Sequence, residues 1–238
     1  LYLITKVKTK LKKILLSILL TIILYTTFIL GTRGALLGLI ICFGVYFFFI
    51  IINYKTIKNQ LSGLFLIAFS VILSVMFNLN TNFKGTGNSV IERASSISIA
   101  TTDGSVNQRL RYYKHGLSQF LETPFLGIGV GNWKFKSIGY DKNDILQYTV
   151  PYHAHNDFIQ ILAEQGVFGF LCYVMVFLTS LFILLKRKLI STNSPYIFLM
   201  GSFLIFFLDS NLNFPIARPI SHLQFILIIA LISTNQKD

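Results

Sequence analysis

Long apolar runs are the feature of this sequence that most restricts its fold. Ile14–Leu30 is almost unbroken by polar residues, and a second run, Ala35–Ile52, follows the short interruption at 31–34. As a helix, the first run rises about 25 Å, enough to cross most of a bilayer's hydrocarbon core. Hydrophobic residues make up 53% of the 238 and charged residues only 13%, which is too apolar for an ordinary soluble domain. We therefore predict an all-α polytopic membrane protein.

Four further apolar runs bring the predicted number of transmembrane helices to six. A long polar segment separates the first three from the last three, so we expect one membrane domain in three parts: 1–79, a loop at 80–165, and 166–238. The sequence starts without Met and shows no cleavage site, so we expect the C-terminal part of a longer chain. The predicted spans are Ile14–Leu30, Ala35–Ile52, Leu61–Leu79, Gly166–Leu185, Tyr196–Leu208 and Ile220–Ile232.

The positive charge is distributed as membrane topology requires. The net charge of +12 alone would allow a nucleic-acid partner, but a basic face with interleaved aromatic residues is not found. Instead, short basic clusters flank the apolar runs, which is the positive-inside pattern. We expect no nucleic acid, a cytoplasmic N-terminus and an outward-facing 80–165 loop. The clusters are Lys6, Lys8, Lys10, Lys12 and Lys13; Lys55 and Lys58; and Lys186, Arg187 and Lys188.

This topology brings three polar segments to the outer face. They are Arg33, the 80–165 loop and the turn Asp209–Pro219. Ionisable groups at a membrane edge are costly unless they are paired or functional, so we predict a shared polar cavity. Cys42 and Cys172 lie within apolar runs and are interpreted as small buried hydrophobic residues.

Within the loop, Gln108–Leu121 has the pattern of an amphipathic helix. We expect it to lie in the membrane interface with its apolar side down; that side comprises Leu110, Tyr113, Leu117, Phe120 and Leu121. The glycine-rich turn Gly127–Asn132 follows. Its N–H groups could bind an anion, with Gly129 contacting substrate, although it lacks the Lys-Ser/Thr ending of a P-loop. A tight turn against the membrane surface explains the glycines equally well.

The segment that begins at His155 combines proton-handling side chains with a membrane-length helix. His155 titrates near neutrality and could accept a proton from an attacking hydroxyl. Asn156 or Asp157 could cap the helix, and Gly166 and Gly169 would let another helix approach closely. A helix start at the lipid interface with an incidental histidine remains an alternative.

Three arginines from separate segments fit a phosphate-binding role. Arg33, Arg109 and Arg218 could hold a lipid-linked diphosphate through planar, permanently charged groups. Arg111 and Lys114 fit better as headgroup anchors. The chain contains no DxD, HExxH or GxSxG pattern. We therefore expect no metal and no cofactor, and a displacement in which arginines stabilise the departing diphosphate.

Several motifs, in order, resemble the O-antigen ligase/Wzy polymerase superfamily. His155-Asn156, nine residues and Gly166-x-x-Gly169 match its H-[NSQ]-x9-G-x-x-G signature, and Thr32-Arg33-Gly34-Ala35 matches its Ser/Thr-Arg-Gly-Ala. Arg109 and Tyr113 resemble its R-x-x-x-W, with Tyr in place of Trp, and Pro124–Gly129 matches Pro-x-x-Gly-x-Gly. The resemblance covers about residues 30 to 232.

The resemblance implies a GT-C-like, metal-independent and inverting membrane glycosyltransferase. It would move a glycan from undecaprenyl diphosphate to lipid A-core or another glycan acceptor, on the periplasmic face of the bacterial inner membrane among membrane lipids. The matching catalytic residues are Arg33, Arg109 and His155, with Arg218, Asn156, Tyr113 and Gly129 binding substrate. Whether His155 is a base or only orients the acceptor stays open.

Three other functions are compatible with the sequence. A Wzy-type polymerase and a protein O-oligosaccharyltransferase share the histidine region, because acceptor choice depends on loop shape. A non-enzymatic transporter subunit for lipid-linked glycans could use the arginines to guide its cargo. The transporter would require polar residues near the middle of several spans, whereas the charges here lie at span ends or in loops.

Overall fold

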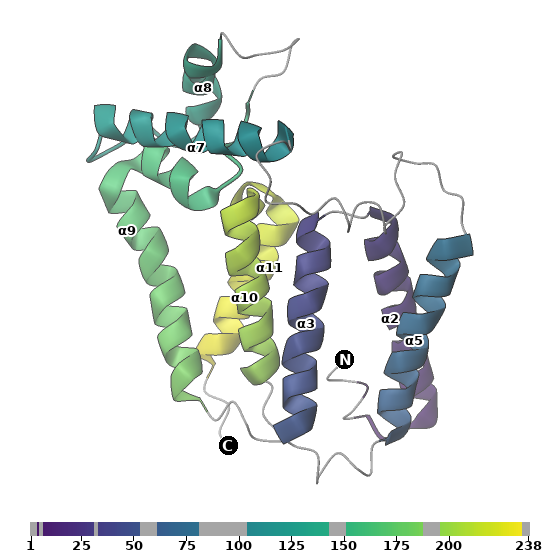
Figure 1. The fold of residues 1–238 in the computed structure, drawn as a ribbon. Helices are drawn as coiled ribbons and strands as arrows, with labels where there is room; N and C mark the ends of the chain where they lie inside the picture. The colour runs from purple at the N-terminus through teal and green to yellow at the C-terminus, as the bar shows by residue number, and fades with distance from the viewer. Residues whose placement is uncertain are drawn as a thin grey trace. The chain divides into compact units, whose positions relative to one another are not determined.

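The structure is a computed structural model of the chain. It describes residues 4, 7–30, 33–52, 61–80, 104–142, 151–187 and 196–234. In these ranges all regular structure is helical (Figure 1), so an all-α fold is confirmed there. Two compact units are present: unit 1 comprises Leu1–Ser98 and Lys188–Gly201, and unit 2 comprises Ile99–Arg187 and Ser202–Asp238.

Six apolar helices lie on the six predicted apolar runs. Three of them, α2, α3 and α9, are long and apolar enough to cross a membrane, and the other three have shorter apolar stretches. By length and composition this is a multi-pass membrane protein. Two helices are longer than the predicted apolar runs: α9 begins nine residues before Gly166, and α10 continues past Leu208. The helices are α2 (Lys10–Leu30), α3 (Arg33–Ile52), α5 (Leu61–Asn80), α9 (Asp157–Lys186), α10 (Tyr196–Leu212) and α11 (Pro219–Ser233).

In unit 1, α2 and α5 pack through a pair of serines. Ser17 and Ser70 are both buried, and their Oγ atoms lie 2.7 Å apart. Small side chains let helix backbones approach closely, and each hydroxyl satisfies the other in apolar surroundings. The neighbouring core joins Tyr46 of α3, Ile67 of α5 and Phe198 from the first turn of α10.

In unit 2, α9, α10 and α11 pack around aromatic rings. Phe177 of α9 lies at the centre of this cluster, and Phe206 and Phe225 stack face to face with their centroids 4.0 Å apart. Offset and stacked rings of this kind contribute beyond their buried area. The rings that contact Phe177 belong to Phe158, Tyr173, Phe203, Phe206, Phe207 and Phe225.

The region predicted as a loop contains two helices near the start of α9, one of which, α7, lies across it (Figure 1). They are α7 (Gly104–Glu122), which extends the predicted helix, and α8 (Trp133–Asp141), which was not predicted. Because Gly116 has no side chain, Ile159 of α9 packs directly onto α7. The face of α7 that packs on α9 therefore differs from the predicted apolar side: it carries Tyr112, Gly116 and Gln119, whereas Leu110, Leu117 and Leu121 are exposed.

The glycine-rich turn is built into a break in α9. Gly166 has φ 65°, which interrupts the helix, and a Cβ there would clash with the carbonyl oxygen of Phe125. The backbone of the turn pairs with the break: Ile128 N donates to Ala163 O, Gly129 N to Glu164 O, and Val167 N to Pro124 O. A close backbone approach at Gly166 was predicted and is present, but the segment that approaches is the loop before the glycine-rich turn and not another helix. The anion-binding interpretation loses support because these amides are already engaged.

We expect Gly166→Ala to destabilise unit 2 strongly. The substitution combines a left-handed backbone with a clash against main-chain atoms, and strain of this kind costs about 1–3 kcal/mol. The lone tryptophan, Trp133, is fully buried beside this region. Its fluorescence emission should therefore shift to the red on thermal unfolding, at a lower temperature in the variant than in the parent. Gly139→Ala is the matched control, because a Cβ at that helical position meets nothing within 4 Å. Equal melting temperatures for the two variants would contradict the packing described here.

Candidate functional site

The segment Pro151–Asn156 leads into α9 and carries the histidines. Asn156 has an extended backbone (φ −159°, ψ 113°), and its Oδ1 accepts from the N–H of Ile159 at 3.1 Å. It is therefore the N-cap of α9, as predicted for Asn156 or Asp157. A capped start means that the residue before it, His155, has a defined position relative to the helix.

Hydrogen bonds tie this start to α7 and to the end of α10. The Nδ2 group of Asn156 donates to the carbonyl oxygen of Asn211 at 3.1 Å. The Tyr113 hydroxyl lies 3.1 Å from the carbonyl oxygen of His155 and 3.2 Å from that of Asn211, so its single proton can serve either. Two predicted substrate-binding residues, Asn156 and Tyr113, thus hold the histidine segment in place.

The backbone of His155 adopts a left-handed conformation that residues other than glycine rarely adopt. Its φ is 56°, and among the described residues it is the non-glycine residue with positive φ. Such a conformation costs energy and persists only where surrounding contacts enforce it, which is frequent at functional sites. Here Asn156 on one side and the Tyr113 contact to its own carbonyl supply that enforcement.

Aromatic rings surround both imidazoles of the segment. His155 stacks at 6.3 Å on Tyr112 and meets Phe214 edge-on at 5.1 Å. His153 stacks on Phe214 with a centroid distance of 4.1 Å, and the Arg218 guanidinium carbon lies 4.4 Å from the same ring centroid. The arrangement brings together α7, the segment before α9 and the turn between α10 and α11.

The environment favours a neutral His155. Burial lowers the pKa of His155, and the positive charges of Arg109, His153 and Arg218 lower it further. Burial also lowers the pKa of His153. The Nδ1 atoms of both imidazoles are buried and make no hydrogen bond within the described residues. A neutral imidazole can accept a proton, which the general-base role requires.

The buried carboxylates of unit 2 have structural partners. Asp157 is 1% exposed, and its Oδ2 accepts from the N–H of Ile216. Glu164 accepts from the backbone N–H of Trp133 at 3.0 Å, holding α8 against α9. Because the side chains of Asp157 and Glu164 are buried, they do not offset the positive charges at the surface near the site.

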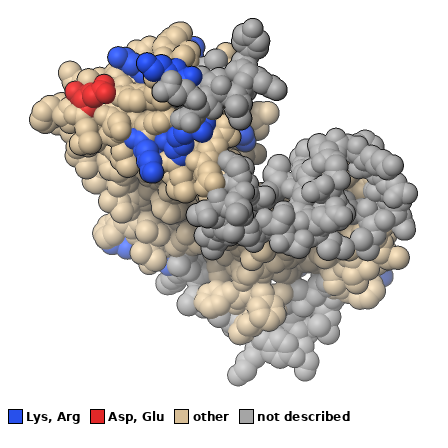
Figure 2. All heavy atoms as spheres, turned by 45° about the horizontal axis from the view of Figure 1, so that its top comes forward, with Lys and Arg blue, Asp and Glu red and all other residues tan. Residues whose placement is uncertain are grey.

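Figure 2 shows that basic side chains gather on this face of unit 2. In unit 2, Lys114, Lys134, Lys136, Lys142 and Arg218 are exposed, while Arg109 and Arg111 are partly exposed. A field of this sign attracts anionic ligands such as a diphosphate. It acts together with the local charges beside His155.

Of the seven predicted site residues, four lie around His155, which is itself one of the seven. Arg109, Arg218, Tyr113 and Asn156 all act on His155 or its backbone. Gly129 lies apart from them in the glycine-rich turn, where its N–H donates to the backbone carbonyl oxygen of Glu164. Arg33 is the first residue of α3 in unit 1, and its side chain lies outside the described residues. Across the described ranges, no three His, Cys, Asp or Glu side chains form a metal-binding group.

Comparison with known families decides the classification. The family model of the O-antigen ligases (Wzy_C) matches residues 16–174, more than half of the chain. The chain belongs to the O-antigen ligase (Wzy_C) family. Membership implies ligase- or polymerase-type glycan transfer, with lipid-linked glycans as the general substrate class. Neither a curated protein nor a solved structure matches the chain significantly.

The matched region contains Arg33, Arg109 and His155, whereas Arg218 lies beyond it. Sequence reasoning missed His153, Tyr112 and Phe214 as members of the site. Their signal was weak, because tyrosine and phenylalanine are abundant throughout this chain. The one available hint was position, since Phe214 precedes Arg218 by one turn in a segment already expected at the outer face.

We expect the His155 imidazole to titrate below its ordinary pKa of about 6.5, and Arg109→Gln to raise that pKa. Above the pKa the ring is neutral. Below it the ring gains a charge beside two guanidinium groups, and losing one of them makes protonation easier. Histidine NMR titration of the full chain in nanodiscs measures this, with the four signals assigned through His→Gln variants. An unchanged His155 titration in Arg109→Gln would contradict the proximity of the two groups; Lys134→Gln, on α8, is the control.

Proposed function

We propose that the chain transfers a glycan from undecaprenyl diphosphate to lipid A-core, as an O-antigen ligase. The observation that carries this proposal is the convergence of Arg109 and Arg218 on a half-buried His155, whose pKa burial and these charges lower. Family membership supplies the reaction class. The proposal also includes six membrane spans, the division into 1–79, 80–165 and 166–238, a cytoplasmic N-terminus and a site that faces the periplasm of the bacterial inner membrane.

In this mechanism, the acceptor hydroxyl attacks the anomeric carbon of the lipid-linked sugar. The new bond forms between that carbon and the acceptor oxygen, while the bond to the diphosphate breaks and inverts the carbon. His155 takes the hydroxyl proton, or orients the hydroxyl so that the proton passes to the leaving group. The departing diphosphate carries away the bonding electron pair as negative charge.

The arginines would stabilise that developing charge. Arg109 and Arg218 supply permanently charged donors beside His155, and Arg33 joins them as the third phosphate ligand in the proposal. Tyr113 and Asn156 fix the backbone of the histidine segment, and through it the direction of the imidazole. Fixed donors need no reorganisation as charge develops, and this lowers the barrier.

We expect His155→Asn to lower transfer by about 10²–10⁴-fold. Asparagine tolerates the left-handed backbone at this position better than alanine does, so the loss reports on the imidazole and not on the fold. The assay uses purified full chain in nanodiscs with synthetic undecaprenyl-diphosphate glycan and lipid A-core. Arg109→Gln should lose activity similarly. Arg187→Gln is the matched arginine control, because Arg187 caps the opposite end of α9.

Full activity in both His155→Asn and Arg109→Gln would overturn the site. The products separate the related functions. A longer lipid-linked glycan without transfer to core indicates a Wzy-type polymerase, and transfer to an added protein acceptor indicates a protein O-oligosaccharyltransferase. Movement of the donor across the bilayer with no new glycosidic bond indicates a transporter subunit.

A further inference from the structure

The ring of Phe214 contacts three charged or titratable side chains. The imidazole of His153 lies nearly parallel to it, with 15° between the planes, and His155 points at it edge-on at 79°. The Arg218 guanidinium lies over the ring at 4.4 Å. The electron-rich face of an aromatic ring attracts a cation, so Phe214 gives the exposed Arg218 side chain a preferred position next to both imidazoles.

The backbone that follows Phe214 is restricted. Pro215 and Pro219 restrict the chain, and the short helix η2 (Pro215–Ala217) between them places Arg218 one turn after Phe214. The N–H groups of Ala217 and Arg218 donate to the carbonyls of Phe214 and Pro215. The ring and the guanidinium therefore belong to one rigid turn.

The same turn is attached to the start of α9. The N–H of Ile216 donates to the buried carboxylate of Asp157 at 3.2 Å. Asp157 follows the N-cap Asn156, whose side chain donates to Asn211 at the end of α10. Two bonds thus link the histidine segment to the turn, one before Phe214 and one after it.

We propose that Phe214 is a positioning residue that holds the Arg218 guanidinium and the His153 and His155 imidazoles in one arrangement. Its consequence for catalysis rests on the proposed function. Other groups also act on the imidazoles: Arg109, Tyr112 and Tyr113 from α7 face His155, and Glu164 and Gln160 from α9 act on His153. The test therefore separates the contribution of Phe214 from theirs.

The test compares Phe214→Leu with Phe214→Tyr. Leucine removes the ring, frees Arg218 and opens the imidazoles to water, so His153 and His155 should titrate at higher pH in the histidine NMR spectrum. The acidic limb of the pH–rate profile for transfer should shift to higher pH with these pKa values. At pH 7, kcat should fall about ten-fold or more. Tyrosine keeps both ring faces and should restore kcat to within about two-fold of the parent, because the ring contacts are retained. Phe207→Leu is the matched control, since Phe207 contacts Phe158 and Phe177 and neither imidazole within the described residues.

Arg218→Gln separates positioning from general loosening. If Phe214 acts partly through Arg218, adding Phe214→Leu to Arg218→Gln should move the His155 titration less than it does in the parent chain, because only the loss of burial then remains. Full additivity, or an unmoved titration in a folded Phe214→Leu protein, would overturn the proposal. Should Phe214→Leu fail to fold, Phe214→Met, which keeps more volume, takes its place. If the parent chain transfers no glycan, the proposed function fails, and the NMR titration still decides the role of Phe214.

Discussion

The capped start of α9 is the constraint on which the rest of the site depends. A helix of this length has unpaired N–H groups at its first turn, and Asn156 satisfies one of them while also donating to Asn211. Asp157, the next residue, binds the turn that follows α10. Because these bonds lie within two residues of His155, small changes in the packing of α7, α9 and α10 would be transmitted directly to the imidazole.

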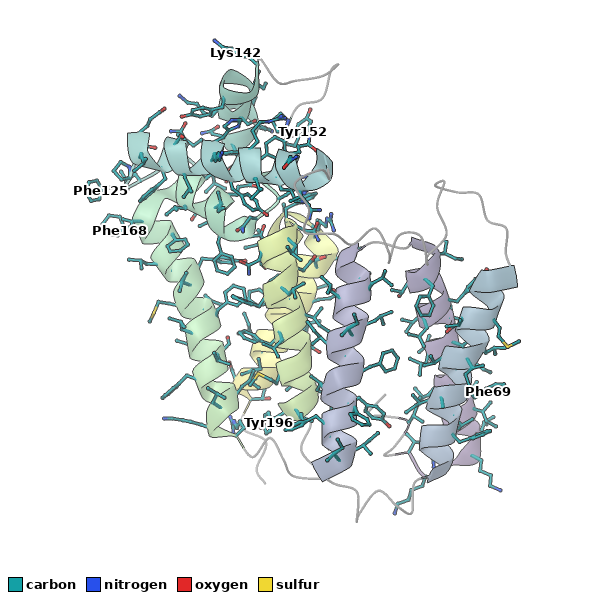
Figure 3. All side chains as sticks on the ribbon, in the orientation of Figure 1. Phe69, Phe125, Lys142, Tyr152, Phe168 and Tyr196 are labelled. Atoms are coloured by element: carbon teal, nitrogen blue, oxygen red, sulfur yellow. The ribbon has the colours of Figure 1, made fainter. Side chains whose placement is uncertain are left out.

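The same packing explains why the glycines lie where they do. A loop can approach α9 this closely only where the helix is broken and both segments lack Cβ atoms at the contact. Gly127 in the loop and Gly166 in α9 meet this requirement. The break redirects α9 below its first turns, so the helix can both carry the site and continue as an apolar span (Figure 3). Phe125 and Phe168, labelled at this bend, contact each other across it.

The sequence predicted the helices well because hydropathy over a membrane-length window is a strong signal. Motifs and local polarity also singled out Arg109, Tyr113, His155, Asn156 and Arg218, which the structure brings together. The face of α7 that contacts α9 and the role of Phe214 were not predicted, because tertiary packing determines both. The leucines of α7 form the more hydrophobic stripe, yet Gly116 and Tyr112 face α9 because only a glycine admits Ile159 there. Phe214 looked like any other phenylalanine, since its role arises from contacts between distant segments.

Binding of labelled undecaprenyl diphosphate to the full chain in nanodiscs tests most directly whether Arg109 and Arg218 hold one diphosphate beside His155. Arg109→Gln and Arg218→Gln should each weaken binding about ten- to hundred-fold, because each removes a charge-assisted hydrogen bond. Arg187→Gln should leave the Kd unchanged. If Arg109→Gln and Arg218→Gln bind as tightly as Arg187→Gln, neither arginine contacts the diphosphate and the site is wrong.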